Sequence, residues 1–131
     1  MIFVDTSAFL AILVADDLSH SPAVECWRTL LEEEKSLLTN NYVLVETLSI
    51  LQKRLGLARA REFHEQLLPF MTIEWVDGNQ HEASLRFLFA ANRRQLSLVD
   101  CSAFETMRRL RIEKVFTFDS HFAEQGFEII P

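Results

Sequence analysis

The amino-acid sequence predicts an α/β fold with a mostly parallel central sheet and helices on both faces of the sheet. Short apolar runs of strand-forming residues alternate with helical patterns from one end of the chain to the other, an alternation typical of parallel strands joined by helices. The runs contain few polar residues, as expected for strands that are buried on both faces. With 131 residues, 49% of them apolar, the chain can bury one core, so we expect a single domain over residues 1–131.

The first half of the chain is predicted to form two strands and four helices. In order, these are a strand over 1–4, helices over 8–15 and 22–34, a strand over 36–39, and helices over 41–55 and 57–70. Ser21 and Pro22 suit the N-cap and the first position of the second helix. Gly56 suits the C-cap of the helix over 41–55.

The second half continues the alternation. It is predicted to form a strand over 71–76, a helix over 80–94, a helix that begins at Ser97 or Val99 and ends at Leu110, and strands over 115–118 and 128–130. A short helical segment over 120–125 lies between the last two strands. No internal repeat, low-complexity stretch or linker interrupts this pattern.

The net charge and the cysteines restrict the functions to be considered. The net charge of −6 argues weakly against a nucleic-acid partner, because phosphate binding favours a basic surface. The two cysteines, Cys26 and Cys101, are too far apart in sequence for a recognisable zinc motif and too few for a disulfide framework. We find no signal peptide or membrane-spanning run, so a reducing cytoplasm is the expected location.

Four acidic residues occupy positions where a metal site is expected. Asp5 and Asp119 each follow a predicted buried strand, and Asp100 lies at the start of a helix. Ligands of open α/β sheets bind beyond the carboxyl ends of the strands. Glu46 lies within a helix, with the apolar Val43 and Ile50 on its face. A divalent cation is a natural counter-charge for a carboxylate in such surroundings.

The chemistry of these ligands suggests which metal they would hold. A site of carboxylate oxygens without a nearby cysteine or histidine pair suits Mg²⁺ or Mn²⁺ better than zinc. Such an ion would lower the pKa of a bound water and stabilise charge on a phosphate. Four crowded carboxylates repel one another, so we expect some of their pKa values to be raised when no metal is bound.

Helix capping is the alternative interpretation of the same acids. Asp5 could cap the helix that follows it, Asp119 could cap the segment over 120–125, and Ser97 with Asp100 resembles a capping box. Glu46 could extend past Ile50 to solvent. Spacing alone leaves the metal site and the capping interpretation open.

Four sequence motifs resemble the PIN-domain family in order and spacing. These are Ile2-Phe3-Val4-Asp5-Thr6-Ser7-Ala8, Val43-Leu44-Val45-Glu46-Thr47, Leu98-Val99-Asp100-Cys101 and Phe116-Thr117-Phe118-Asp119-Ser120-His121-Phe122. The resemblance covers nearly the whole chain and is most specific over 97–131. It implies a three-layer α/β/α sandwich and a Mg²⁺- or Mn²⁺-dependent endoribonuclease that cleaves RNA. Asp5, Glu46, Asp100 and Asp119 match the family's catalytic, metal-binding acids.

The resemblance also implies supporting residues and partners. Thr6 or Ser7 matches a hydroxyl position near the first acid, and Thr117 matches one before the last. Many small bacterial members of the family are VapC-type toxins that form homodimers and pair with a short antitoxin protein. We therefore expect a toxin of a type II toxin–antitoxin pair, although solitary PIN nucleases share the same motifs.

Basic side chains are needed to contact the phosphates of RNA. The candidate RNA-binding residues are Arg108, Arg109, Arg111, Lys114, Arg93 and Arg94. The alternative is a solvated helix face that pairs with Glu105 and Glu113. We expect His121 to be a surface residue at a helix start and Cys101 to be a buried filler. The many phenylalanines are expected in the core or in a dimer interface.

Two other functions compete with a nuclease. A phosphatase with a nucleophilic aspartate after the first strand usually has a second acid two residues later, but Ser7 occupies that position. A non-catalytic RNA- or protein-binding module would be expected to have lost an acid, and this chain retains all four. The sequence therefore favours the metal-dependent nuclease.

Overall fold

A five-stranded, all-parallel sheet forms the centre of the computed structural model, which describes residues 1–131. Its strand order is β3-β2-β1-β4-β5. The strands are β1 (Ile2–Val4), β2 (Leu37–Asn40), β3 (Met71–Glu74), β4 (Lys114–Phe116) and β5 (Glu128–Ile130). The predicted α/β class and the predicted parallel sheet are confirmed.

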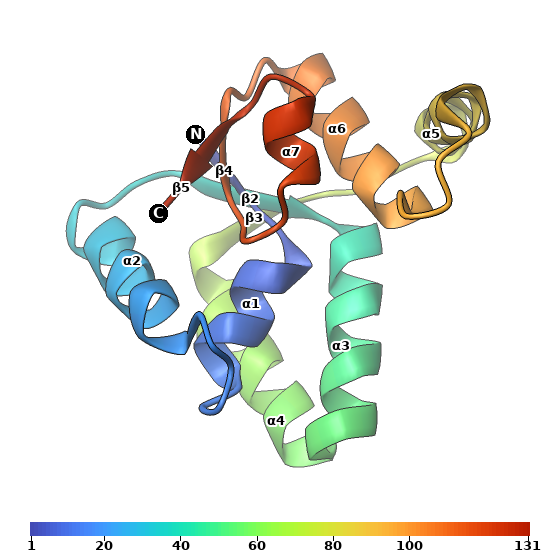
Figure 1. Ribbon diagram of the computed structural model, residues 1–131. Helices are drawn as coiled ribbons and strands as arrows, with labels where there is room; N and C mark the ends of the chain where they lie inside the picture. The colour runs from blue at the N-terminus through green and yellow to red at the C-terminus, as the bar shows by residue number, and fades with distance from the viewer.

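Helices cover both faces of this sheet. They are α1 (Thr6–Leu13), α2 (His20–Glu32), α3 (Asn41–Leu55), α4 (Leu57–Glu62), α5 (Gly78–Ala91), α6 (Leu98–Leu110) and α7 (His121–Glu124). A π-helical turn over Phe63–Leu67 and a 3₁₀ turn over Leu68–Phe70 follow α4. Figure 1 shows α1, α2 and α4 on one side of the sheet and α6 and α7 on the other, with α5 packed against α6. The three-layer arrangement is therefore confirmed.

The order of the strands creates a natural binding position next to β1. From β1 the chain adds β2 and then β3 on one side, and later returns to add β4 and β5 on the other side. Ile2 and Val4 of β1 pair with Lys114 and Phe116 of β4. A crevice forms at such a reversal because the connections leaving the two strands run to opposite faces. The segments that follow β1 and β4 therefore meet at the carboxyl edge of the sheet.

Most elements lie where the sequence predicts them, but several boundaries differ. Helix α1 begins at Thr6, two residues early, because Asp5 is its N-cap. Ser21 is not the N-cap of α2: that position is Ser19, and Pro22 lies in the first turn, where its missing N–H needs no partner. Helix α5 ends three residues early, at Ala91, because Asn92 adopts a left-handed conformation with a φ of 51°. Strands β3 and β4 each end two residues earlier than predicted.

Aromatic rings fill much of the core between the sheet and its helices. Phe104 of α6 is fully buried and makes edge contacts with Phe87 of α5 and Phe122 of α7, at centroid distances of 5.9 and 5.0 Å. The guanidinium of Arg108 lies over the rings of Phe87, Phe104 and Phe127 at 5.3 to 5.9 Å. The expectation of core phenylalanines is thus confirmed for this cluster.

None of the helices combines the length and the apolar character needed to cross a membrane.

A buried asparagine sets the position of α3 relative to α6. Asn40, at the end of β2, is fully buried, and its amide nitrogen donates to the hydroxyls of Ser102 and Thr106 on α6 at 3.2 Å each. Its carbonyl oxygen accepts from the backbone N–H of Val43 at 2.9 Å and so caps α3. Buried polar groups are costly unless they are paired. This network therefore favours one arrangement of the two helices that carry Glu46 and Asp100.

The core role of Phe104 leads to a stability prediction. We expect Phe104→Ala to lower the free energy of unfolding by about 3–5 kcal/mol, because it removes a buried ring from a cluster that cannot fully collapse. Urea denaturation followed by circular dichroism measures this change. The matched control is Phe89→Ala, because Phe89 is 72% exposed and its loss should change stability by no more than about 0.5 kcal/mol. Equal effects of the two changes would contradict the packing described here.

Candidate functional site

The carboxylate of Asp5 is buried at the carboxyl end of the central strand. Asp5 is 4% exposed and caps α1. Its Oδ2 accepts hydrogen bonds from the Ser7 hydroxyl at 3.1 Å, the Ser7 backbone N–H at 3.4 Å and the Thr117 hydroxyl at 3.0 Å. The structure thus brings two of the predicted hydroxyl residues to the first acid, one from α1 and one from the segment after β4.

The same hydroxyls hold the segment that carries Asp119. The Ser7 Oγ accepts from the backbone N–H of Phe118 at 2.9 Å, and the Thr117 Oγ1 accepts from the backbone N–H of Asp119 at 3.0 Å. Each hydroxyl therefore donates to Asp5 and accepts from the chain that follows β4. This pattern fixes the backbone of Asp119 relative to the Asp5 carboxylate.

Asp100 is held at the start of α6 by a reciprocal capping box. Its Oδ2 accepts from the backbone N–H of Ser97, and the Ser97 hydroxyl accepts from the backbone N–H of Asp100, both at 3.0 Å. The capping interpretation is therefore confirmed for Asp100, as it is for Asp5. Capping does not remove the carboxylate from the site, because the Asp100 side chain, 14% exposed, also lies beside His121.

His121 begins α7, as expected, but its side chain lies among the acids and is only partly exposed. Its side chain is 18% exposed, and its Nδ1 lies 3.2 Å from Asp119 Oδ1 and 3.9 Å from Asp100 Oδ2. The backbone N–H of His121 donates to the same Asp119 oxygen at 2.9 Å. The only sequence signal was its position two residues after Asp119, which by itself does not give the direction of a side chain.

Glu46 approaches the other acids from α3. It is half-buried, and the negative charges of Asp100 and Asp119 act on it. Thr6 contributes a hydroxyl that hydrogen-bonds with Glu46 and also accepts from the Thr47 hydroxyl at 3.2 Å, joining α1 to α3. The four predicted acids thus come from α3, from α6 and from the segments that follow β1 and β4, and they meet at one edge of the sheet.

Asp5, Glu46 and Asp100 have raised pKa values, as expected for some of the acids, but burial is the main cause. Burial and, to a lesser extent, the charge of Asp100 raise the pKa of Asp5 to about 6, against the hydrogen bonds from Thr117 and Ser7. Burial also raises the pKa of Glu46, with Asp100 and Asp119 adding to it. The pKa of Asp100 is raised by burial first and by Asp119 second. Desolvation therefore outweighs the mutual repulsion that the sequence suggested.

The arrangement fits a divalent cation. Asp100, Asp119 and His121 each offer a ligand atom, and these atoms lie within 4.8 Å of one another. Asp5 and Glu46 lie beside this group, as their electrostatic coupling to Asp100 indicates. The group also contains one imidazole nitrogen, from His121, whereas only carboxylate oxygens were expected as ligands from the sequence.

Four of the six candidate RNA-binding residues lie away from the acids. Arg108 and Arg109 are at the far end of α6, about 12 Å along the helix from Asp100. Arg108 packs on aromatic rings and donates to Gln125, and Arg109 pairs with Glu74 at 2.9 Å and Glu105 at 3.6 Å. The expected pairing with Glu105 is therefore found for Arg109, whereas Arg108 pairs with neither Glu105 nor Glu113.

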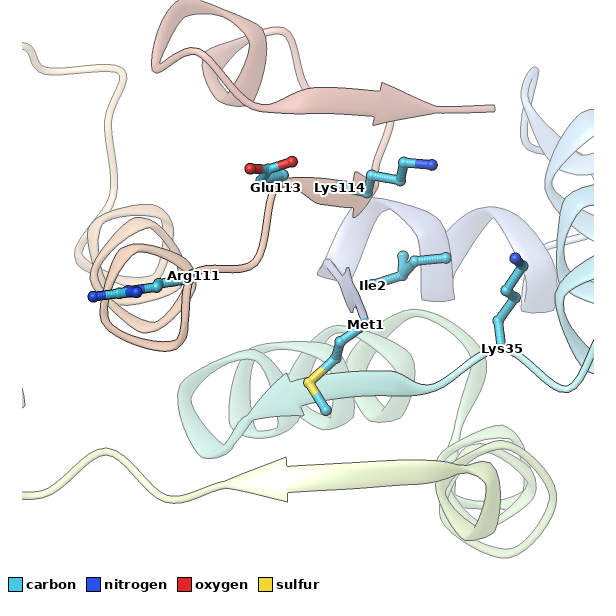
Figure 2. Close-up of a pocket in the computed structure, with 6 residues that line it drawn as sticks. All are labelled: Met1, Ile2, Lys35, Arg111, Glu113 and Lys114. Atoms are coloured by element: carbon cyan, nitrogen blue, oxygen red, sulfur yellow. The ribbon is translucent and has the colours of Figure 1, made fainter.

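Arg111 and Lys114 lie at the opposite edge of the sheet. Lys114 is the first residue of β4 and pairs with Ile2, whereas the acids follow the strand ends. Figure 2 shows the pocket that these residues line, in which the side chains of Arg111 and Lys114 point in different directions. The length of β4 separates Lys114 from Asp119, so a role of Arg111 and Lys114 in RNA binding stays a prediction and would involve a surface away from the acids.

Arg93 and Arg94 lie in the loop between α5 and α6. Both precede Ser97, the N-cap of the helix that carries Asp100. Arg93 also pairs with Glu124 of α7 at 2.7 Å, which joins this loop to the helix that begins with His121.

Cys101 is buried, and burial with the charge of Asp100 raises the pKa of its thiol to about 11. This supports its interpretation as a filler.

Comparison with known proteins agrees with this geometry. A model of the PIN domain family matches residues 2–128. The chain is 32% identical over 128 residues to the 23S rRNA-specific endonuclease VapC20 of Mycobacterium tuberculosis, covering 97% of this chain and 95% of that protein. The crystal structure of M. tuberculosis VapC20, described as a sarcin–ricin loop cleaving toxin, superposes with a TM-score of 0.87 at 30% identity, over 97% of this chain and 96% of that chain.

More distant structures share the fold. FitAcB from Neisseria gonorrhoeae superposes with a TM-score of 0.72 at 13% identity, over 100% of this chain and 97% of that chain. FitAB bound to a DNA fragment superposes with a TM-score of 0.73 at 14% identity, over 99% of this chain and 94% of that chain. Because the family model spans nearly the whole sequence and VapC20 matches it end to end, this chain belongs to the PIN-domain family.

Proposed function

We propose that this protein is a metal-dependent endoribonuclease whose active site comprises Asp5, Glu46, Asp100 and Asp119. The observation that carries the proposal is the meeting of these acids, drawn from four separate segments of the chain, at the carboxyl edge of the sheet. Three of them have raised pKa values, which is common where acids are gathered for chemistry. The relationship to an rRNA endonuclease supports RNA as the substrate.

The chain's residues have separate tasks in this proposal. Asp100 and Asp119 are the principal metal-holding acids, and Asp5 and Glu46 complete the negatively charged site. When bound, Mg²⁺ or Mn²⁺ supplies an activated water and offsets charge on the scissile phosphate. Ser7 and Thr117 hold one oxygen of Asp5, and Ser97 orients Asp100. These contacts keep the acids in place before RNA binds, which limits reorganisation during the reaction.

The biological role follows from the same relationship. We propose that the protein acts in the cytoplasm as the toxin of a type II toxin–antitoxin pair, as a homodimer restrained by a small antitoxin protein. Its substrate would be a structured RNA of the kind that VapC20 is named for, the sarcin–ricin loop of 23S rRNA. Residues 1–131 would act as one domain, since one hydrophobic cluster includes side chains from β1 to α7.

Replacement of the first acid tests the site directly. We expect Asp5→Asn to lower the cleavage rate of a sarcin–ricin loop RNA by more than about a hundredfold, because it removes a negative charge next to the metal. Asparagine is used because its side-chain oxygen can still cap α1. Cleavage is followed on gels with Mg²⁺, Mn²⁺ or EDTA. Asp16→Asn, at an exposed position, is the control, and equal cleavage by Asp5→Asn and the control would refute the site.

The raised pKa of Asp5 predicts how stability depends on pH. Between its ordinary value of 3.8 and about 6, the folded chain holds a proton that the unfolded chain releases. The contribution of Asp5 to the stability of the metal-free protein should therefore be greatest below about pH 4. This contribution should be lost as the pH rises from there through about 6. A shift of this size corresponds to about 3 kcal/mol, and Glu46 and Asp100 add effects of the same sign.

Urea denaturation in EDTA from pH 4 to pH 7 measures this dependence. Asp5→Asn should flatten the profile, and Asp16→Asn should retain it. Saturating Mn²⁺ at pH 7 should increase the free energy of unfolding of the wild-type protein, because the ion binds the ionised acids of the folded chain. A wild-type profile that equals that of Asp5→Asn would show that the Asp5 carboxylate does not titrate in this way.

The positions of the basic residues predict which of them bind RNA. Replacing Arg93 and Arg94 by alanine should reduce the slope of log affinity against log salt concentration by about 0.7 for each lost phosphate contact with single-stranded RNA. Binding is measured by fluorescence anisotropy in the Asp5→Asn background, so that the RNA stays intact. Arg111→Ala with Lys114→Ala is the matched control, because it removes two charges at the opposite edge. A larger effect of the control pair would reverse this assignment.

A further inference from the structure

His121 places a nitrogen atom among the acids of the site. Its Nδ1 lies 3.2 Å from Asp119 Oδ1 and 3.9 Å from Asp100 Oδ2. The backbone around this nitrogen is held at two points, because the His121 N–H donates to Asp119 and Phe122 is fully buried in the core. The position of the imidazole is therefore set by the fold.

The Nδ1 atom is buried and forms no hydrogen bond. Nδ1 lies close enough to the Asp119 carboxylate for a hydrogen bond. The hydrogen bond is absent because the nitrogen does not point at the carboxylate oxygen. A buried polar atom without a partner lowers the stability of the folded chain. A partner from outside the chain would remove this cost.

The distances suit ligand atoms that share one cation. Adjacent ligands of an octahedral ion with bonds of about 2.1 Å lie about 3.0 Å apart, and opposite ligands lie about 4.2 Å apart. The observed separations of Nδ1 from the two carboxylate oxygens, 3.2 and 3.9 Å, lie between these two values. A tight ion pair or hydrogen bond would instead direct Nδ1 at one carboxylate oxygen.

We propose that Nδ1 of His121 is a direct ligand of the catalytic cation, together with oxygens of Asp100 and Asp119. The inference rests on the proposed metal-dependent nuclease and identifies a donor that the four acids alone do not include. Imidazole suits transition metals, whereas Mg²⁺ favours oxygen ligands and water. The nitrogen therefore biases the site toward Mn²⁺ relative to Mg²⁺.

Pulsed electron paramagnetic resonance of the Mn²⁺-loaded protein detects a directly bound nitrogen. We expect a ¹⁴N coupling in the wild type that becomes a ¹⁵N coupling when the protein is produced with ¹⁵N-histidine. The variant His121→Asn replaces the nitrogen donor with an amide that can present oxygen, and the coupling should disappear. His64→Asn is the matched control, because His64 is exposed on the π-helical turn that follows α4, and it should retain the coupling.

Metal affinities measured by calorimetry give the second readout. His121→Asn should weaken Mn²⁺ binding about tenfold and Mg²⁺ binding less than about threefold, so that the preference for Mn²⁺ falls. Circular dichroism of each variant verifies that it is folded. The wild-type coupling requires no variant, so the test stands even if His121→Asn is unstable.

The outcomes separate this inference from the proposed function. Mn²⁺ that binds the wild type without a histidine coupling, or a coupling that persists in His121→Asn, would overturn the role of His121 and leave the carboxylate nuclease intact. Failure of the wild type to bind either Mn²⁺ or Mg²⁺ would overturn the proposed function itself. Loss of the coupling in His121→Asn alone, with the altered metal preference, would establish the nitrogen ligand.

Discussion

The buried carboxylate of Asp5 is the constraint on which the rest of the site depends. Burying a charged group is costly unless it is well paired, and here Ser7 and Thr117 donate to it from two segments that are far apart in sequence. The same two hydroxyls accept from Phe118 and Asp119. The Asp5 side chain thereby joins the end of β1 to the chain leaving β4, and the remaining acids are arranged around this connection.

Helix capping by Asp5 and Asp100 does not exclude the metal binding proposed for them. Asp5 caps α1, and Asp100 forms a capping box with Ser97. Both roles place a carboxylate at the start of a helix, and α1 and α6 both begin at the carboxyl edge of the sheet. The local hydrogen bonds orient each acid, and the fold brings the oriented acids together. Sequence patterns could not separate the two interpretations, because both need the same residue at the same position.

Features that depend on local sequence pattern, such as the strands, could be predicted from the sequence. Contacts that depend on how the chain folds back on itself could not. Apolar runs located the strands, and the apolar face around Glu46 identified an acid inside a helix. Lys114 is five residues from Asp119, but β4 carries the chain from one edge of the sheet to the other between them. Asn40 and His121 were missed for a related reason. Their partners, Ser102 with Thr106 and the Asp100 carboxylate, come from another element and leave no mark on the neighbouring sequence.

The pairing of β1 with β4 also determines when the site can first exist during synthesis of the chain. Residues 2–4 leave the ribosome well before their partners at 114–116 are made. Until then the central strand has one unpaired edge, and neither Thr117 nor Asp119 is present to complete the acid cluster. Because chains emerge at about 5–20 residues per second, the nascent polypeptide spends several seconds without a complete site. The acids can therefore come together only after β4 and the segment that follows it have been made and β4 has paired with β1.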